Sequence, residues 1–132
     1  MRHRENKNVN ILTNEKILVV TSNDLNNNPR PRRLISYLNS KYCVDVLSPN
    51  NQSDLTLNQH YALAEPDIIL RIKRKILRYF SKYIGKYNVF DKWCYHISRQ
   101  AIIDIKTNNI QYDFIFIENI KLLPLLMHLS YK

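Results

Sequence analysis

The sequence predicts an α/β fold with a Rossmann-like, doubly wound parallel sheet, and three observations predict it. Short apolar runs, typical of buried parallel strands, alternate with amphipathic helical stretches in the order β-α-β-(α-α)-β-α. The length of 132 residues suits a single domain of roughly 100–200 residues. A composition of 45% apolar and 23% charged residues is typical of a chain with a packed core and excludes disorder throughout.

The first three elements form a βαβ unit. The run Lys16–Thr21 (KILVVT) is almost continuously apolar and predicts a buried strand. Asn28 is suited to cap a helix and Pro29 to begin it, and the helix is expected to end near Lys41. Tyr42–Leu47 (YCVDVL) predicts the second strand. The crossover between two such parallel strands is right-handed.

The composition also suggests where the domain begins and where its main loop lies. Residues 1–14 are polar, and we expect a flexible N-terminal segment there. Residues 15–132 then hold the Rossmann-like domain. The stretch Asn50–Glu65 is polar, which predicts a loop, with a short strand around Leu55 as the alternative.

A strongly basic amphipathic helix is predicted from Pro66 onward. Apolar side chains recur at spacings of three or four residues, as they do on one face of a helix: Ile69, Ile72, Ile76, Phe80 and Tyr83. The other positions carry the cations Arg71, Lys73, Arg74, Lys75, Arg78, Lys82 and Lys86. No acidic residue occurs between Ile68 and Lys86, and Gly85 is expected to end the helix.

Three further elements complete the pattern. Val89–Lys106 predicts another helix, and Tyr112–Glu118 (YDFIFIE) predicts another buried strand. Ile120–Leu129 predicts a helix with Pro124 in its first turn. This last helix is apolar on nearly every side and therefore needs cover. We expect the doubly wound sheet to be incomplete at its C-terminal end.

The topology predicts a ligand site where the strand order reverses. If the first strand and the Tyr112–Glu118 strand are neighbours, the loops that follow them form a crevice at the carboxyl ends of the strands. The candidate ligand-binding residues there are Asn23, Asp24, Asn28, Arg30, Glu118 and Asn119. Arg30, Arg32 and Arg33 lie in a helical first turn, where backbone N–H groups favour anions. The equally weighted alternative is that all these residues are solvated loop and cap residues.

The basic helix has three possible roles. Lys and Arg side chains attract an anionic partner, and the net charge of the chain is +9. On a membrane, the cations would meet acidic lipid while the apolar face enters the interface; the candidate contacts are Arg71, Arg74, Lys75, Arg78, Lys82 and Trp93. Nucleic acid is a disfavoured partner, because no recognised binding motif accompanies the charge. Alternatively, the apolar face packs on the sheet and the charges are only solvated.

Several kinds of site are disfavoured by the sequence. Gly85 is the only glycine, which excludes glycine-rich phosphate loops. Cys94 and His96 have no second ligand pair, so no metal site is expected. Two cysteines, Cys43 and Cys94, are too few for a disulfide framework, and we expect reduced thiols in a cytoplasmic protein. No run approaches the roughly 20 apolar residues that cross a bilayer, and the basic N-terminus lacks the apolar core of a secretory signal.

Two segments resemble the N-terminal domain of GT-B glycosyltransferases of family 4. The run KILVVTSNDLNNNPRPRRLISYLNSKYCVDVLSP is similar to the family's first strand, arginine-containing helix and second strand. The run WCYHISRQAIIDIKTNNIQYDFIFIENIKLLPLL resembles a later segment, with Trp93, Asp113 and Leu123-Pro124 at the matching positions. The family's glycine-rich loop is absent, and Glu118 and Asn119 stand where the family has His and Asp.

The resemblance implies the acceptor-side half of a sugar-transferring enzyme. Such a domain holds a glycan or lipid-linked acceptor, in capsule, lipopolysaccharide or similar surface-polysaccharide synthesis. We expect Glu118 to be the catalytic carboxylate, which orients or deprotonates an acceptor hydroxyl, as a carboxylate within hydrogen-bond reach can. The chain itself would bind no cofactor, because the nucleotide-sugar donor belongs to a second domain or a partner chain, and 132 residues cannot hold both domains. We therefore expect a fragment that is inactive alone and lies in the cytoplasm, peripherally on the inner face of the membrane. The alternative is a non-enzymatic α/β binding module that acts through the basic helix.

Overall fold

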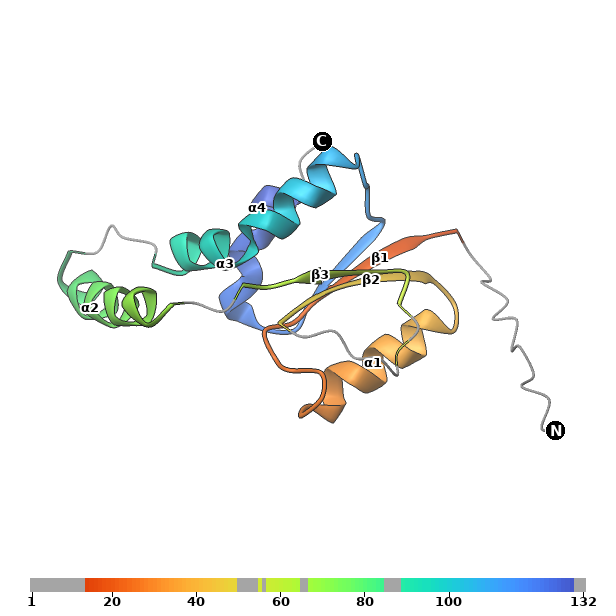
Figure 1. The fold of residues 1–132 in the computed structure, drawn as a ribbon, viewed down its shortest axis with the longest axis horizontal. Coiled ribbons are helices and arrows are strands. Elements are labelled where there is room, and N and C mark those ends of the chain that lie inside the picture. The colour runs from red at the N-terminus through yellow and green to blue at the C-terminus, as the bar shows by residue number, and fades with distance from the viewer. Residues whose placement is uncertain (1–13, 50–54, 56, 65–66, 85–88, 130–132) are drawn as a thin grey trace.

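The computed structural model describes residues 14–49, 55, 57–64, 67–84 and 89–129 (Figure 1). In chain order the elements are β1 (Lys16–Val20), α1 (Pro29–Asn39), β2 (Cys43–Ser48), β3 (Gln59–Ala62), α2 (Ile68–Ile84), α3 (Val89–Thr107), β4 (Phe114–Ile117), the 3-10 helix η1 (Ile120–Leu125) and α4 (Leu126–Leu129).

The four strands form one parallel sheet in the order β3-β2-β1-β4. This confirms the Rossmann-like α/β fold. The chain leaves β1 toward β2 and β3 on one side, and then returns to place β4 on the other side of β1. The strand order therefore reverses between β1 and β4. This is the neighbour relation that the predicted crevice requires.

Helices cover both faces of the sheet, as Figure 1 shows. On the α1 face, alternate residues of β1 and β2 pack with Leu25, Ile35 and Leu38. On the other face, a second cluster joins Leu18 and Val20 to α3 and η1. Because successive side chains of a strand point to opposite faces, β1 contributes to both clusters and is buried along nearly its whole length.

Local sequence signals explain α1. The Asn28 side chain accepts a hydrogen bond from the Arg30 backbone N–H at 3.2 Å, and Pro29 and Pro31 occupy the first turn. Proline costs little there because the backbone N–H groups of a first helical turn have no partner within the helix, so a missing N–H breaks no helical hydrogen bond. Ile35 and Leu38 then turn their side chains into the core. The predicted cap is confirmed.

Three expectations need correction. The strand expected around Leu55 lies at β3, where QHYA offers little apolar alternation. The Tyr112–Glu118 strand is not buried on both faces. Phe114 and Phe116 lie on the α1 face of β4, outside the cluster that α1 covers, and are 54% and 41% exposed. The last helix begins as the 3-10 helix η1, with Pro124 inside it, and becomes α-helical only from Leu126.

Candidate functional site

The site lies where β1 and β4 end, and Glu118 is its centre. The Glu118 backbone N–H donates to the Val20 carbonyl at 3.0 Å, which continues the pairing of the two strands by one residue. The Thr21 hydroxyl donates to Oε2 of the Glu118 carboxylate at 2.5 Å. The Asn23 side-chain amide reaches the same oxygen at 3.5 Å. Two residues from the loop after β1 therefore hold a carboxylate that comes from the loop after β4.

A second link joins the same two loops. The Asn119 side-chain amide donates to the Ser22 hydroxyl at 2.9 Å. The Asn119 side-chain oxygen accepts from the Lys121 backbone N–H at 3.0 Å, so the same side chain also caps η1. Asn119 therefore fixes the position at which the chain leaves β4, and this orients Glu118.

The Glu118 carboxylate is exposed, whereas Thr21 is fully buried. Thr21 also accepts from the Asn23 backbone N–H at 3.1 Å, which positions its hydroxyl for donation to Glu118. Oε1 of Glu118 takes part in neither of the two bonds that hold Oε2. An oriented carboxylate on an exposed residue can accept a hydrogen bond, and then a proton, from a hydroxyl group.

Asp24 and Asn28 shape the loop after β1. The two carboxylate oxygens of Asp24 accept from the Asn26 backbone N–H at 2.9 Å and from the Asn27 side chain at 2.8 Å. The Asp24 carbonyl accepts from the Asn28 backbone N–H at 3.0 Å. Both side chains are engaged within their own loop and helix cap, and ligand contact by either one stays a prediction.

Arg30 is exposed on the first turn of α1, a turn that contains no acidic residue. Its place at this helix end suits an anion, because N–H groups and the positive end of the helix dipole lie there. Among the described residues, no hydrogen bond or ion pair joins Arg30 to Glu118. The structure thus brings Asn23, Glu118 and Asn119 together, whereas Asp24, Asn28 and Arg30 form the beginning of α1.

Sequence reasoning missed Thr21 and Ser22, the residues that bind Glu118 and Asn119. Thr21 ends the run KILVVT, and its buried hydroxyl needs a partner. A polar residue closing a buried strand is the signal that could have pointed to it.

Four of the predicted membrane contacts, Arg71, Arg74, Lys75 and Arg78, lie on α2 as expected. Arg74 is half-buried and the other three are exposed. The side chains of Lys82 and Trp93 lie outside the described residues.

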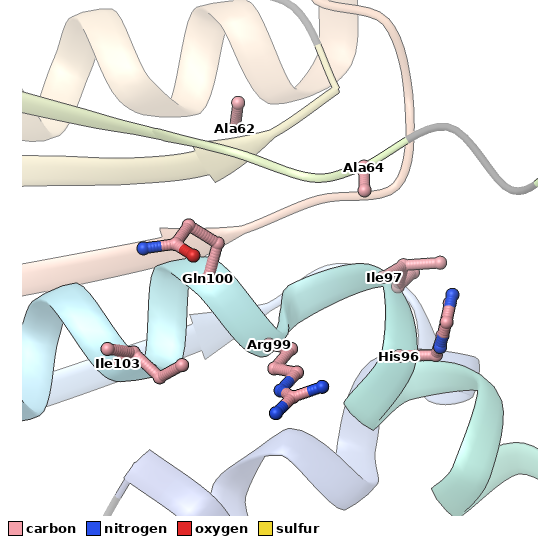
Figure 2. Close-up of a pocket in the computed structure, with 7 residues that line it drawn as sticks. All are labelled: Ala62, Ala64, His96, Ile97, Arg99, Gln100 and Ile103. Carbon is pink, nitrogen blue, oxygen red and sulfur yellow. The ribbon is translucent and has the colours of Figure 1, made fainter.

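A shallow hollow of about 520 Å³ lies away from Glu118, between the end of β3 and α3 (Figure 2). Ala62 and Ala64 line it from the β3 side. The lining residues of α3 are His96, Ile97, Arg99, Gln100 and Ile103. In Figure 2 the Arg99 side chain points away from Ala64. None of the predicted acceptor-binding residues contributes to this hollow.

Within the described ranges, no group of His, Cys, Asp and Glu could hold a metal ion. None of the described helices has both the length and the apolar character needed to cross a membrane. Searches against family models, curated proteins and solved structures found no match to this chain. The likeness to glycosyltransferases therefore rests on the residues quoted above.

Proposed function

We propose that this chain is the acceptor-side half of a glycosyltransferase. The observation that carries the proposal is the Glu118 carboxylate, held by Thr21 and Asn23 between the ends of β1 and β4. Open α/β sheets bind their ligands in this position, outside the carboxyl ends of the strands at the reversal of strand order. The resemblance to family 4 supplies the reaction class, and a cell-surface glycan or a lipid-linked sugar is the acceptor.

The chemistry assigned to Glu118 is that of a general base. An acceptor hydroxyl oxygen bonds to the anomeric carbon of the donor sugar, and the bond from that carbon to the nucleotide breaks with its electrons going to the nucleotide. The hydroxyl proton passes to Oε1 of Glu118. Asn23 and Asn119 would orient the acceptor through their amides, and Arg30 would meet an anionic group of it. The donor nucleotide-sugar is bound by another domain or a partner chain.

The proposal places the chain in the cytoplasm, peripherally on the inner face of the membrane, where a lipid-linked acceptor is presented. Synthesis of capsule, lipopolysaccharide or a similar surface polysaccharide is the corresponding role. The basic helix α2 supports this location, because Ile68–Ile84 carries six cations and no acid.

Acceptor binding can be tested on the chain itself by following backbone amide NMR signals. The ligands are short glycans, offered free and joined by phosphate to a short isoprenoid chain. We expect shifts at residues 21–24 and 118–119. Glu118→Gln should weaken binding about tenfold or more, because a hydrogen bond to a charged group contributes about 1.5–3 kcal/mol.

Asp113→Asn is the matched control, because it removes an equal charge just before β4, at the opposite end of that strand from Glu118. Equal weakening by both variants would contradict the assignment of Glu118, as would shifts confined to the hollow beside α3. In an enzyme completed with its donor domain, unchanged transfer by Glu118→Gln would exclude Glu118 as the base.

The second candidate is a binding module without an active site that acts through α2 on a membrane or on nucleic acid. The exposed cations of α2 favour it. The hydrogen-bonded loops around Glu118 would have no function in such a binding module, which is why we place this candidate second. An absence of glycan shifts together with retained binding through α2 would reverse the order.

A further inference from the structure

The structure distinguishes three sides of α2. Leu70 and Leu77 are half-buried and lie seven residues apart, on one side of the helix. The helix that packs against α2 is α3. The remaining apolar side chains of the described part are at least half exposed: Ile68 73%, Ile69 66%, Ile72 52%, Ile76 50%, Tyr79 64% and Phe80 53%. We call these six residues the exposed stripe.

The exposed stripe does not attach α2 to the domain. In Figure 1, α2 extends away from the sheet, whereas α1 and α3 lie against it. The alternative in which the apolar face packs on the sheet is therefore wrong for the described residues. A soluble monomer seldom exposes a large contiguous apolar patch without a partner for it.

Cations border the exposed stripe. At about 100° per residue, Arg71, Lys75 and Arg78 occupy the helix sector between the stripe and Arg74. All three are exposed. No Asp or Glu occurs from Ile68 to Ile84. The helix therefore offers an apolar band with a positive band beside it.

We infer that α2 is a membrane-docking element that binds the surface of an anionic lipid bilayer. Such a surface places phosphate groups directly above hydrocarbon, and so it satisfies both bands at once. A nucleic acid would pair with the cations and leave the isoleucines in water. In the docked state the helix lies parallel to the surface, with the exposed stripe in the interface and Arg71, Lys75 and Arg78 at the headgroups.

Docking deepens the peripheral membrane location included in the proposed function and rests on that part of it, because it names the helix face and the class of lipid. It would serve the glycosyltransferase half and the binding module alike. Its test needs neither an acceptor nor a donor domain. Failure of docking would leave the role of Glu118 open, and failure of glycan binding would leave docking open.

The experiment is co-sedimentation of the full chain with vesicles. One set is neutral phosphatidylcholine, and the other contains about one third phosphatidylglycerol. We expect binding to the anionic set that weakens as salt rises, because exposed charges are screened. Removing the three cations (R71Q, K75Q and R78Q together) should lower the affinity about 100-fold, at roughly fivefold for each cation near the surface.

Two controls locate the effect. K16Q, K106Q and K121Q together remove the same charge from exposed positions outside α2 and should change the affinity much less. Ile72→Ser with Ile76→Ser should weaken binding while Ile103→Ser on α3, also exposed, should not. Circular dichroism verifies that each variant is folded.

Three results would overturn the inference. The first is an equal loss in both triple-charge variants, which would show attraction by net charge alone. The second is equal binding to neutral vesicles at high salt. The third is tighter binding of a generic DNA duplex that depends on Arg71, Lys75 and Arg78 and not on Ile72 or Ile76, which would identify nucleic acid as the partner.

Discussion

Strand β1 and helix α2 are both rich in aliphatic residues, yet they use them in opposite ways. Ile17, Leu18, Val19 and Val20 of β1 are at most 2% exposed, because β1 has a strand on each side and a helical layer on each face. In α2 the isoleucines at 68, 69, 72 and 76 are 50–73% exposed. An apolar pattern locates a face that avoids water, and the topology decides whether the domain itself covers that face.

The largest expected effect is on the free energy of unfolding, when one aliphatic side chain is truncated in the sheet and one in α2. Leu47→Ala removes a fully buried side chain from β2 and should lower the free energy of unfolding by about 2–5 kcal/mol. Ile72→Ala on α2 removes a side chain that is 52% exposed and should change it by less than about 0.5 kcal/mol. Urea denaturation without lipid measures both values.

The contrast between the buried strands and the exposed helix would be wrong if Ile72→Ala destabilised the chain as much as Leu47→Ala. Such a result would mean that the exposed stripe is covered within the protein in solution. Membrane docking would then lose the surface on which it depends.

Much of the fold could be predicted from the sequence, for physical reasons that differ between elements. KILVVT and the Asn28-Pro29 cap are local signals, and β1 and α1 follow them. The neighbouring positions of β1 and β4 could be anticipated because an α/β sheet has few allowed topologies. The sequence therefore predicts that Asn23 and Glu118 lie together at the carboxyl ends of β1 and β4.

Other features depend on contacts between distant residues and could not be predicted. Strand β3 (QHYA) pairs with β2 through backbone bonds, which QHYA signals only weakly. The run FIFI of β4 is as apolar as a central strand, but no strand covers its outer edge in the described structure. The link from Thr21 to Glu118 joins residues 97 positions apart.

A smaller effect is expected from removing a tyrosine hydroxyl that contacts a buried group rather than one on the surface. The Tyr112 hydroxyl donates to Oδ2 of the buried Asp45 carboxylate at 2.7 Å. Burial, and then the Asp45 carboxylate, raise the pKa of Tyr112 far above its ordinary value. Tyr112→Phe should cost about 1–3 kcal/mol of unfolding free energy, since it leaves Asp45 with the Asn58 amide and without the hydroxyl donor.

Tyr37→Phe is the matched control. The Tyr37 hydroxyl accepts from Lys41 Nζ at 3.0 Å in an exposed position, and its removal should change stability by at most about 0.5 kcal/mol. Equal losses in both variants would show that burial does not govern the strength of these contacts. Urea denaturation at pH 7 distinguishes the two results.

The smallest expected effect concerns His60, a half-buried residue between the two extremes. Ser48 Oγ lies 2.8 Å from His60 Nε2 in the neighbouring strand. Burial lowers the pKa of His60 below its ordinary value, and a backbone hydrogen bond with Ser48 opposes that shift. The unfolded chain therefore takes up a proton on His60 before the folded chain does. The stability contributed by neutral His60 is complete above the ordinary pKa of about 6.5 and is lost as the pH falls through that value toward the lower folded pKa. Unfolding free energies at pH 7.5 and pH 5.5 should fall more for the wild type than for His60→Gln. Parallel pH dependences would mean that the imidazole is solvated to the same extent in the folded and unfolded chains.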